Sequence, residues 1–173
     1  IRAKAEHFFQ QYGCSEAGCI AINPDLTAAG DMGHVLPHMS LEAGVSTDAP
    51  GELVVMRNGR PIATSDLGYR RADGMLVFVS RLDDMINVSG LNVYPGEVEE
   101  ILYQHPDVVE AAVVGVPDSH YGEEVAAVVV LTAGATTTHD DIESWCRERL
   151  SAYKIPRMVL FVDELPKGST GKI

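Results

Sequence analysis

The residues best suited to chemistry close the chain, in a loop that combines glycines, hydroxyls and lysines. The run Pro-Lys-Gly-Ser-Thr-Gly-Lys ends at Lys172. A phosphate-binding P-loop requires the spacing Gly-x-x-x-x-Gly-Lys-Ser/Thr. Here Gly168 and Gly171 are closer together, and no hydroxyl residue follows Lys172. The pattern disfavours a P-loop NTPase and favours a loop whose lysine carries a point charge into a site built by other residues.

Three more positions carry polar side chains with donors or acceptors for a ligand. Asp66 follows Thr64 and Ser65, and an acidic side chain at a strand end can accept two hydrogen bonds from a ribose diol. Taken alone, Asp66 is more typical of an exposed turn. Arg81 offers fixed planar donors that suit ribose or phosphate oxygens. Tyr12 begins the run Tyr-Gly-Cys-Ser-Glu, which on its own indicates a glycine turn after a strand.

Gly90, in the run Ser-Gly-Leu, allows two interpretations. Glycine marks tight turns and bulges between short strands. It also occurs where a ligand or chain approaches so closely that a side chain would block it. His34 and His38 have the spacing of a helical metal pair, but Pro37 between them interrupts a helix, so surface histidines are the better prediction.

The elements that must position these residues are visible in the hydrophobic pattern. Pro95 suits the first position of a helix, predicted over residues 95–104, whose first turn is acidic. A second helix is predicted over about 140–150, with Thr138 as its cap and Trp145 and Cys146 on its core face. Strands are predicted over residues 51–56, 75–79, 108–116, 125–131 and 158–162, and short strands broken at Ser89-Gly90 are expected over residues 85–93. Residues 1–11 could form a short helix, and residues 20–50 are expected to be rich in loops.

Several segments, in order, resemble the C-terminal part of AMP-forming acyl-CoA synthetases, members of the adenylate-forming superfamily that also includes luciferases and peptide-synthetase adenylation domains. The match covers nearly the whole chain, and its closing segment is the most specific piece. The matching segments are residues 81–86 (RLDDMI), 89–95 (SGLNVYP), 97–99 (EVE), 113–118 (VVGVPD), 122–123 (GE), 153–156 (YKIP) and 165–172 (LPKGSTGK).

The resemblance implies roles in binding ATP or AMP, magnesium and coenzyme A. By match, Tyr12 of the Tyr12-Gly13 pair stacks on adenine, the Ser15 hydroxyl meets phosphate, and Glu16 holds magnesium, a hard cation that prefers oxygen ligands. The remaining matched residues are the ribose carboxylate Asp66, the nucleotide contact Arg81, the hinge Asp83, the Ser89 and Gly90 positions beside the pantetheine channel, and the catalytic Lys172.

Two departures from the family pattern accompany this match. Ser65 replaces the glycine of the usual Thr-Gly-Asp, and Ser80 replaces a glycine before Arg81. The resemblance also implies a domain boundary. Residues 1–82 would be the β-rich end of a large nucleotide- and acyl-binding domain. Residues 83–173 would be a small mobile α+β domain with a three-stranded sheet and two helices.

Composition narrows the classes of function. With 13 basic and 25 acidic residues the net charge is −12, which argues against nucleic-acid binding through phosphate neutralisation. No apolar run reaches the length of a membrane span. The cysteines are odd in number and lack zinc spacing, which favours reduced thiols in a cytoplasmic protein. The first residue is not methionine, and the chain resembles an internal piece of a longer enzyme. The missing N-terminal part of that enzyme is expected to be the partner of this chain.

The expected function is therefore part of an acid–thiol ligase. Such an enzyme activates a carboxylic acid with ATP to an acyl-adenylate and transfers the acyl group to coenzyme A. Segment 92–99 is more similar to acyl- or aryl-CoA ligases than to peptide-synthetase adenylation domains. Two alternatives stay open, a ligase that loads a carrier protein and a noncatalytic binding module. The isolated piece is expected to be inactive, and the residues that would select the carboxylic acid are expected to lie outside it.

Overall fold

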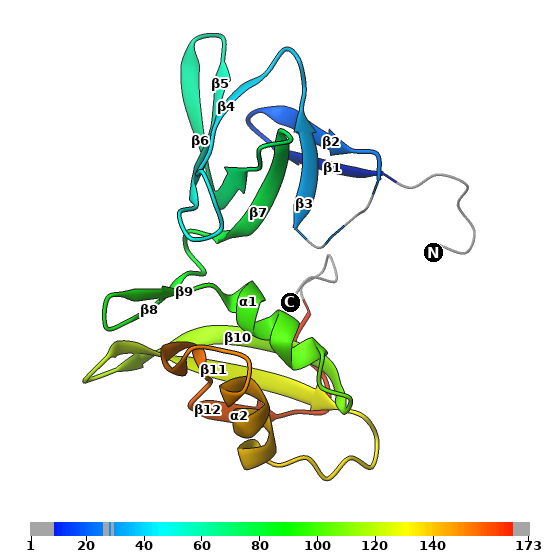
Figure 1. Ribbon diagram of the computed structural model, residues 1–173, viewed down its shortest axis with the longest axis vertical. Coiled ribbons are helices and arrows are strands. Elements are labelled where there is room, and N and C mark those ends of the chain that lie inside the picture. Colours follow the sequence, from blue (N-terminus) through cyan, green and yellow to red (C-terminus); the bar gives the residue numbers. More distant parts are fainter. Residues whose placement is uncertain (1–8, 26–27, 29, 168–173) are drawn as a thin grey trace. The chain divides into compact units, whose positions relative to one another are not determined.

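The chain divides between Asp83 and Asp84 into two compact units, here called unit 1 and unit 2. The computed structural model describes residues 9–25, 28 and 30–167 (Figure 1). Each unit has a hydrophobic core of its own. The predicted position of Lys172 lies outside the described residues.

Unit 1 is a seven-stranded antiparallel sheet in the order β1-β2-β3-β7-β6-β5-β4. Its core includes Ile20, Leu53 and Leu76, each fully buried. Gly13 in β1 and Gly33 in β3 sit at irregularities of the ladder. The strands are β1 (Gln10–Cys14), β2 (Gly18–Asn23), β3 (Asp31–Val35), β4 (Ser40–Glu42), β5 (Gly51–Arg57), β6 (Arg60–Arg70) and β7 (Met75–Arg81).

The loop-rich prediction for residues 20–50 was wrong in part, because β2, β3 and β4 all have residues there. These strands are short, and β3 is interrupted by Gly33, so the alternating pattern is weak. β3 also pairs with β7, which comes about forty residues later, and a pairing of that kind leaves no local signal. At the start of the chain, Gln10 and Gln11 belong to a strand instead of the suggested helix, and residues 1–8 lie outside the described part.

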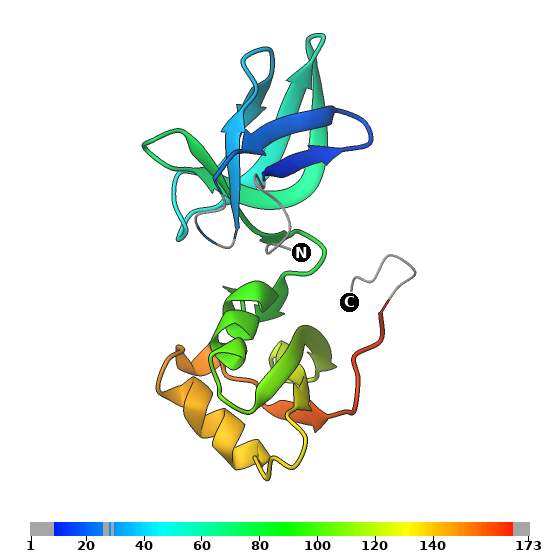
Figure 2. The same ribbon diagram turned by 90° about the vertical axis from the view of Figure 1, so that its right-hand side faces the viewer.

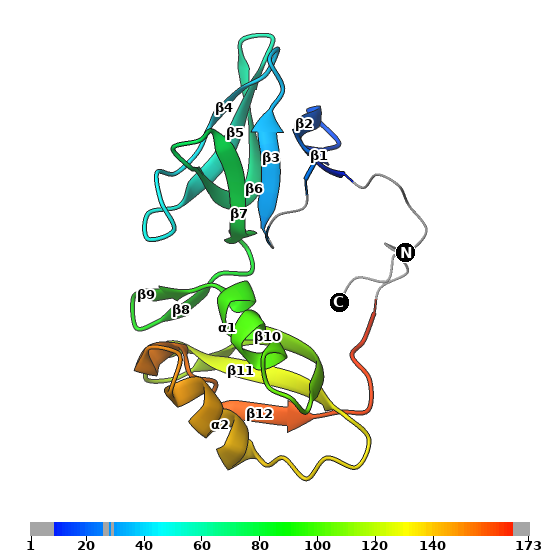
Figure 3. The ribbon, with the colours of Figure 1, turned by 45° about the vertical axis from the view of Figure 1, so that its right-hand side comes forward.

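Unit 2 is an α+β domain whose sheet has five strands instead of the predicted three. The two extra strands are β8 (Ile86–Val88) and β9 (Leu91–Val93), a short hairpin seen in Figure 3. The hairpin joins the sheet through a pair between Val88 and Gly122, which the hydrophobic pattern cannot indicate. The longer strands are β10 (Val108–Asp118), β11 (Gly122–Leu131) and β12 (Met158–Phe161), which lies parallel to β11.

The two helices of unit 2, α1 (Pro95–Tyr103) and α2 (His139–Arg147), lie on the same side of the sheet (Figure 2). α1 begins at Pro95, as predicted, and buries Val98 and Leu102 completely. Each such side chain stabilises the fold by roughly 1.5–3 kcal/mol. α2 begins with a capping box in which the Thr138 side chain accepts from the Asp141 N–H and the Asp141 side chain accepts from the Thr138 N–H. The predicted cap is therefore confirmed.

Trp145 and Cys146 are core residues, as predicted. Cys146 is fully buried, and burial raises the pKa of its thiol to about 11. The Trp145 indole N–H donates to the carbonyl oxygen of Ile101 at 2.9 Å, which ties α2 to α1. His105 meets the indole edge-on at 4.9 Å between ring centroids, and the Arg149 guanidinium lies 3.5 Å from the ring centroid. These contacts fix the indole from several directions.

Among the described helices, none combines the length and the apolar character that crossing a membrane requires.

Candidate functional site

Three of the predicted nucleotide-binding residues meet in unit 1. The Tyr12 hydroxyl donates to Asp66 Oδ2 at 2.8 Å, and Arg81 Nε lies 3.4 Å from Asp66 Oδ1. These side chains come from β1, β6 and β7, and Asp66 is the direct cross-strand partner of Arg81. The sheet thus gathers an aromatic hydroxyl, a carboxylate and a guanidinium from positions 12, 66 and 81. We call them the Asp66 cluster.

The three residues of the Asp66 cluster differ in their exposure to solvent. The Tyr12 residue is 9% exposed, whereas the Asp66 and Arg81 side chains are 18% and 53% exposed. Burial, reinforced by the neighbouring Asp66 carboxylate, raises the pKa of the Tyr12 phenol above its usual value. Tyr12 therefore stays protonated and remains a hydrogen-bond donor, while Asp66 and Arg81 keep polar atoms open to a ligand.

Asp66 does not lie at a strand end, as the sequence suggested, but on a bulge inside β6. Glu52 of β5 pairs with Leu67, and Val54 pairs with Ala63. Between these pairs β5 contributes Leu53 alone, while β6 contributes residues 64–66. The extra residues move the segment out of its ladder with β5, while Asp66 stays paired with Arg81 of β7. Bulges leave little trace in the hydrophobic pattern, which is why the prediction missed this one.

Ser65 occupies the middle of the bulge with φ +59°, a left-handed conformation that favours glycine. This explains the glycine of the usual Thr-Gly-Asp pattern in backbone terms. The predicted departure at Ser65 therefore places an L residue in a strained conformation.

Two polar residues around the bulge were missed by sequence reasoning. Thr64 Oγ1 donates to the Leu53 carbonyl at 2.8 Å and accepts from the Asp66 N–H at 3.2 Å. Glu52 Oε1 accepts from the Ser65 N–H at 3.1 Å. The contacts with Leu53 and Glu52 join two strands and depend on the bulge, so the local sequence gives no sign of them.

The remaining predicted residues of this region lie in the β1–β2 hairpin. A Cβ on Gly13 would stand 2.2 Å from the Gly18 carbonyl oxygen, so glycine is required there by packing. Ser15 and Glu16 are exposed in the turn. The Glu16 carbonyl accepts from Arg57 Nη1 at 2.7 Å, which fastens the turn to β5. An exposed carboxylate at Glu16 has the oxygen donors that suit Mg²⁺.

In unit 2, Ser89 and Gly90 form the two-residue turn of the β8–β9 hairpin, with φ values of +52° and +85°. Positive φ at both central residues is the mark of a type I′ turn. The Gly90 N–H donates to Asn87 Oδ1 at 2.8 Å, and a Cβ on Gly90 would meet no other described atom within 4 Å. The turn interpretation of Gly90 is therefore confirmed, and within the described residues nothing crowds it.

A cavity of about 260 Å³ adjoins this hairpin. Tyr121 and Arg157 stand on its wall in a cation–π contact, with the guanidinium carbon 4.5 Å from the ring centroid. The Ser89 N–H donates to the Tyr121 carbonyl at 2.8 Å, which holds the turn beside the cavity. The cavity is lined by Val88, Ser89, Leu91, Tyr121, Glu124, Val125, Ala152, Tyr153, Ile155 and Arg157.

The two other lysines of the matching motifs have structural partners. Lys154 Nζ lies 2.6 Å from Glu97 Oε1, and Lys167 Nζ lies 2.5 Å from Glu110 Oε1. The Lys154 pair joins the 3₁₀ turn to the first turn of α1. These contacts give both lysines a structural role.

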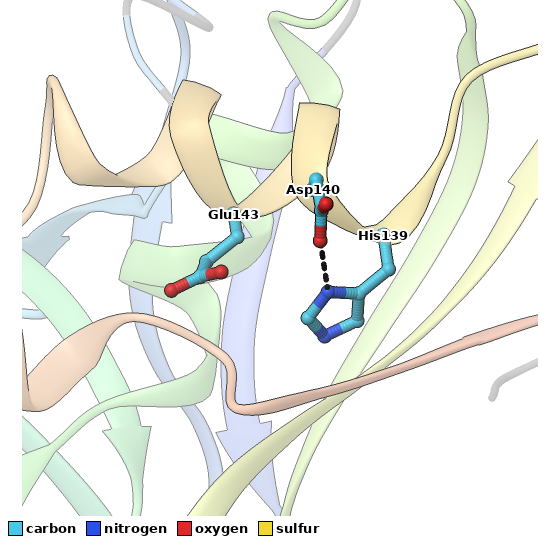
Figure 4. A group of neighbouring side chains, drawn as sticks. All are labelled: His139, Asp140 and Glu143. Carbon is cyan, nitrogen blue, oxygen red and sulfur yellow. Dashed lines mark hydrogen bonds and ion pairs between the residues drawn. The ribbon is translucent and has the colours of Figure 1, made fainter.

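A second group with metal-ligand chemistry lies on α2 (Figure 4). His139 Nδ1 is 3.4 Å from Asp140 Oδ1, and Glu143 follows one turn later. Asp140 is 94% exposed and Glu143 pairs with Arg147 at the next turn. These are the ordinary charges of a solvated helix start, where acidic side chains favour the positive end of the helix dipole.

Sequence comparison gives the chain clear relatives. Residues 97–172 match the family described as AMP-binding enzyme C-terminal domain. A 3,4-dihydroxybenzoate–[aryl-carrier protein] ligase of Bacillus anthracis is 42% identical over all of this chain and 41% of its own length. A long-chain-fatty-acid–CoA ligase of Escherichia coli is 36% identical, again over the whole chain and 36% of its own length. The chain thus spans about two fifths of these relatives.

Solved structures agree with the sequence comparison. ATP-bound MatB from Rhodopseudomonas palustris superposes with a TM-score of 0.86 and 30% identity, over 99% of this chain and 40% of that one. The o-succinylbenzoate CoA synthetase of Bacillus subtilis, in complex with its acyl-adenylate intermediate, superposes with a TM-score of 0.79 and 30% identity. The match covers 99% of this chain and 41% of that one. Residues 97–172 therefore match the AMP-binding enzyme C-terminal domain family, and the whole chain is similar in sequence and fold to adenylate-forming enzymes.

Proposed function

We propose that the full-length protein carrying this chain is an AMP-forming acid–thiol ligase. It would convert a carboxylic acid and ATP to an acyl-adenylate and pyrophosphate, and then transfer the acyl group to the thiol of coenzyme A. The observation that carries the proposal is the Asp66 cluster, which joins Tyr12, Asp66 and Arg81 in the geometry described above.

The lone pairs of Asp66 support a ribose-binding role. A carboxylate has about four acceptor positions, and Tyr12 and Arg81 engage one oxygen each. Acceptor positions remain on both oxygens for the two hydroxyls of a ribose. Arg81, half exposed, can turn its free guanidinium donors to ribose or phosphate oxygens.

The hairpin that ends β1 would hold the phosphate side of the nucleotide. The Ser15 hydroxyl would donate to a phosphate oxygen, and the Glu16 carboxylate would hold Mg²⁺, whose charge offsets that of the phosphates. The ring of Tyr12 would lie against adenine. Its small exposed fraction leaves only an edge of the ring for this contact, so Tyr12 would act mainly by orienting Asp66.

Lys172 would supply the charge for the first half-reaction. When a carboxylate attacks the α-phosphate, negative charge gathers on the phosphoryl oxygens, and a desolvated ammonium stabilises it. Removing such a contact commonly costs about 3–4 kcal/mol of transition-state stabilisation, or about 10²–10³ in rate.

The β8–β9 hairpin would serve the second half-reaction. In this proposal the C-terminal domain, residues 83–173, rotates about Asp83 after adenylation and withdraws Lys172. The rotation brings Ser89 and Gly90 beside the pantetheine arm. The adjoining cavity, with Tyr121, Tyr153 and Arg157 on its wall, offers aromatic surface and a cation to the acceptor. ATP and a free thiol coexist in the cytoplasm, which we propose as the compartment.

A carrier protein is the alternative acceptor. It is favoured by the Bacillus anthracis relative, whose name specifies an aryl-carrier protein. Both acceptors present a pantetheine thiol, so the hairpin could serve either. The carboxylic acid itself stays open, because the relatives act on acids as different as 3,4-dihydroxybenzoate and long-chain fatty acids.

The test is pyrophosphate release by the full-length protein with a panel of aryl and alkyl carboxylic acids, with and without coenzyme A. Acid-dependent release that consumes the coenzyme A thiol supports the ligase and identifies its substrate class. Acid-dependent exchange without thiol loss moves the proposal to the carrier-loading enzyme. If no acid supports exchange, the proposal is wrong and a noncatalytic binding module takes its place.

A further inference from the structure

The bulge that carries Asp66 is held from two sides through a single residue. The Ser65 N–H donates to Glu52 Oε1 at 3.1 Å, and the Ser65 carbonyl accepts from the Leu82 N–H at 2.8 Å. Leu82 immediately precedes Asp83, where unit 1 ends. One peptide segment therefore connects β5, the ligand-facing carboxylate and the last residues of unit 1.

This segment needs outside support. Ser65 has φ +59°, and a non-glycine residue keeps such a conformation only where its surroundings hold it. The Thr64 and Asp66 side chains on either side are bonded within the site. The Ser65 N–H is the one group of the bulge held by a charged acceptor from β5 among the described contacts.

Glu52 is placed to provide that support. It is half-buried on β5, directly before Leu53, the residue that faces the bulge. A hydrogen bond to a carboxylate is stronger than one between neutral groups, and partial burial protects it from competing water.

We propose that Glu52 is a positioning residue for nucleotide binding. By holding the Ser65 N–H, it keeps the bulge in the conformation that aligns the Asp66 carboxylate with Tyr12 and Arg81. Through the Ser65 carbonyl, the same conformation fastens Leu82. Glu52 acts through this peptide and makes no contact with the substrate. Its role in nucleotide binding rests on the proposed function.

The test compares Glu52→Ala with Glu52→Gln in the full-length protein. The alanine variant loses the acceptor, whereas the glutamine variant keeps a neutral one. Glu42→Ala is the matched control, since Glu42 is an exposed acid of β4 in the same sheet. The readouts are KM for ATP and kcat in pyrophosphate release, and amide hydrogen exchange in peptides that contain Ser65 and Leu82.

Glu52→Ala is expected to raise KM for ATP about tenfold, with kcat changed less than about threefold, and to speed exchange in both peptides. Glu52→Gln should recover most of the affinity, and Glu42→Ala should match the unsubstituted protein. An unchanged KM for ATP in Glu52→Ala, or an equal loss in both Glu52 variants, would overturn the proposal.

Failure of the proposed function looks different. In that case the unsubstituted protein releases no pyrophosphate with any acid, and the exchange data decide alone whether Glu52 holds the bulge. Faster exchange at Ser65 and Leu82 in Glu52→Ala, but not in Glu42→Ala, supports the positioning of Asp66. Unchanged exchange refutes it.

Discussion

The Tyr12 hydroxyl shows how one atom can prepare a site. It is buried, its pKa is raised, and it donates to a carboxylate that, in the proposed function, accepts from the ribose at the same time. A fixed donor on one oxygen of Asp66 sets the direction of the remaining lone pairs. Tyr12 therefore acts by orienting the Asp66 carboxylate.

Tyr12→Phe keeps the ring and removes this donor. A hydrogen bond to a charged group contributes about 1.5–3 kcal/mol, so we expect KM for ATP to rise roughly tenfold or more. Tyr69→Phe, on the same β6 strand as Asp66, is the control. The two variants are compared by steady-state kinetics of pyrophosphate release. An unchanged KM for ATP in Tyr12→Phe would show that the Asp66 carboxylate needs no hydrogen bond from Tyr12 to be oriented.

Lys172→Ala tests the charge proposed for the first half-reaction. Adenylation should fall by about 10²–10³, while thioester formation from supplied acyl-adenylate should continue. Lys167→Ala is the matched control, because Lys167 is paired with Glu110. The two half-reactions are measured separately. Equal losses in both would contradict the proposal that Lys172 serves adenylation and the Ser89-Gly90 turn serves thioester formation.

At the scale of elements, the sequence predicted the regular parts of the fold and missed the irregular ones. Pro95, Thr138 and the core face of α2 are local signals, and the structure confirms them. The β6 bulge depends on its register with β5, and the attachment of the β8–β9 hairpin to the sheet depends on Gly122, far along the chain. The contacts of Glu52 and Thr64 with the bulge were missed for the same reason, although Asp66 itself could be predicted by motif.

The β8–β9 hairpin gives a prediction that separates turn geometry from ligand access. Gly90→Leu should slow thioester formation and spare adenylation, since the side chain would enter the proposed pantetheine channel. Gly90→Asn is the control, because asparagine is small and tolerates positive φ. If Gly90→Leu impairs adenylation as much as thioester formation, the hairpin has no selective role in the second step.

α1 carries a pH-dependent group against β10. Glu99 is half-buried and accepts from the Val113 N–H at 2.9 Å. Burial raises its pKa above the ordinary 4.5, although the hydrogen bond opposes the shift. Ionisation therefore costs more in the folded than in the unfolded state, and the cost is present at neutral pH. It disappears as the pH falls through the raised pKa to below 4.5.

Glu99→Gln should consequently be more stable than the unsubstituted chain at neutral pH, and the difference should shrink on acidification through that window. The free energy of unfolding of both proteins, measured across the acid range, makes the test. Glu100→Gln, exposed at the next position of α1, should show no such trend. A difference that is constant with pH would rule out ionisation as its cause.

At the scale of the molecule, the junction between Asp83 and Asp84 separates two cores. If rotation about Asp83 exchanges the two half-reactions, a residue with a fixed φ should suit only one of them. We expect Asp83→Pro to slow one half-reaction at least about tenfold more than the other. Asp83→Ala, which leaves φ free, should preserve both. Parallel losses in Asp83→Pro would argue against a hinge at this residue.

The indole of Trp145 has a practical consequence. It is the chain's single tryptophan, and it lies in unit 2 in contact with a guanidinium and an imidazole, with its N–H bound to the carbonyl oxygen of Ile101. Its fluorescence in the 173-residue chain therefore reports on unit 2 alone. Unit 1, which has tyrosines but no indole, is silent at tryptophan excitation. Comparing this emission with the circular dichroism of the whole chain would reveal whether the two cores melt together or one after the other.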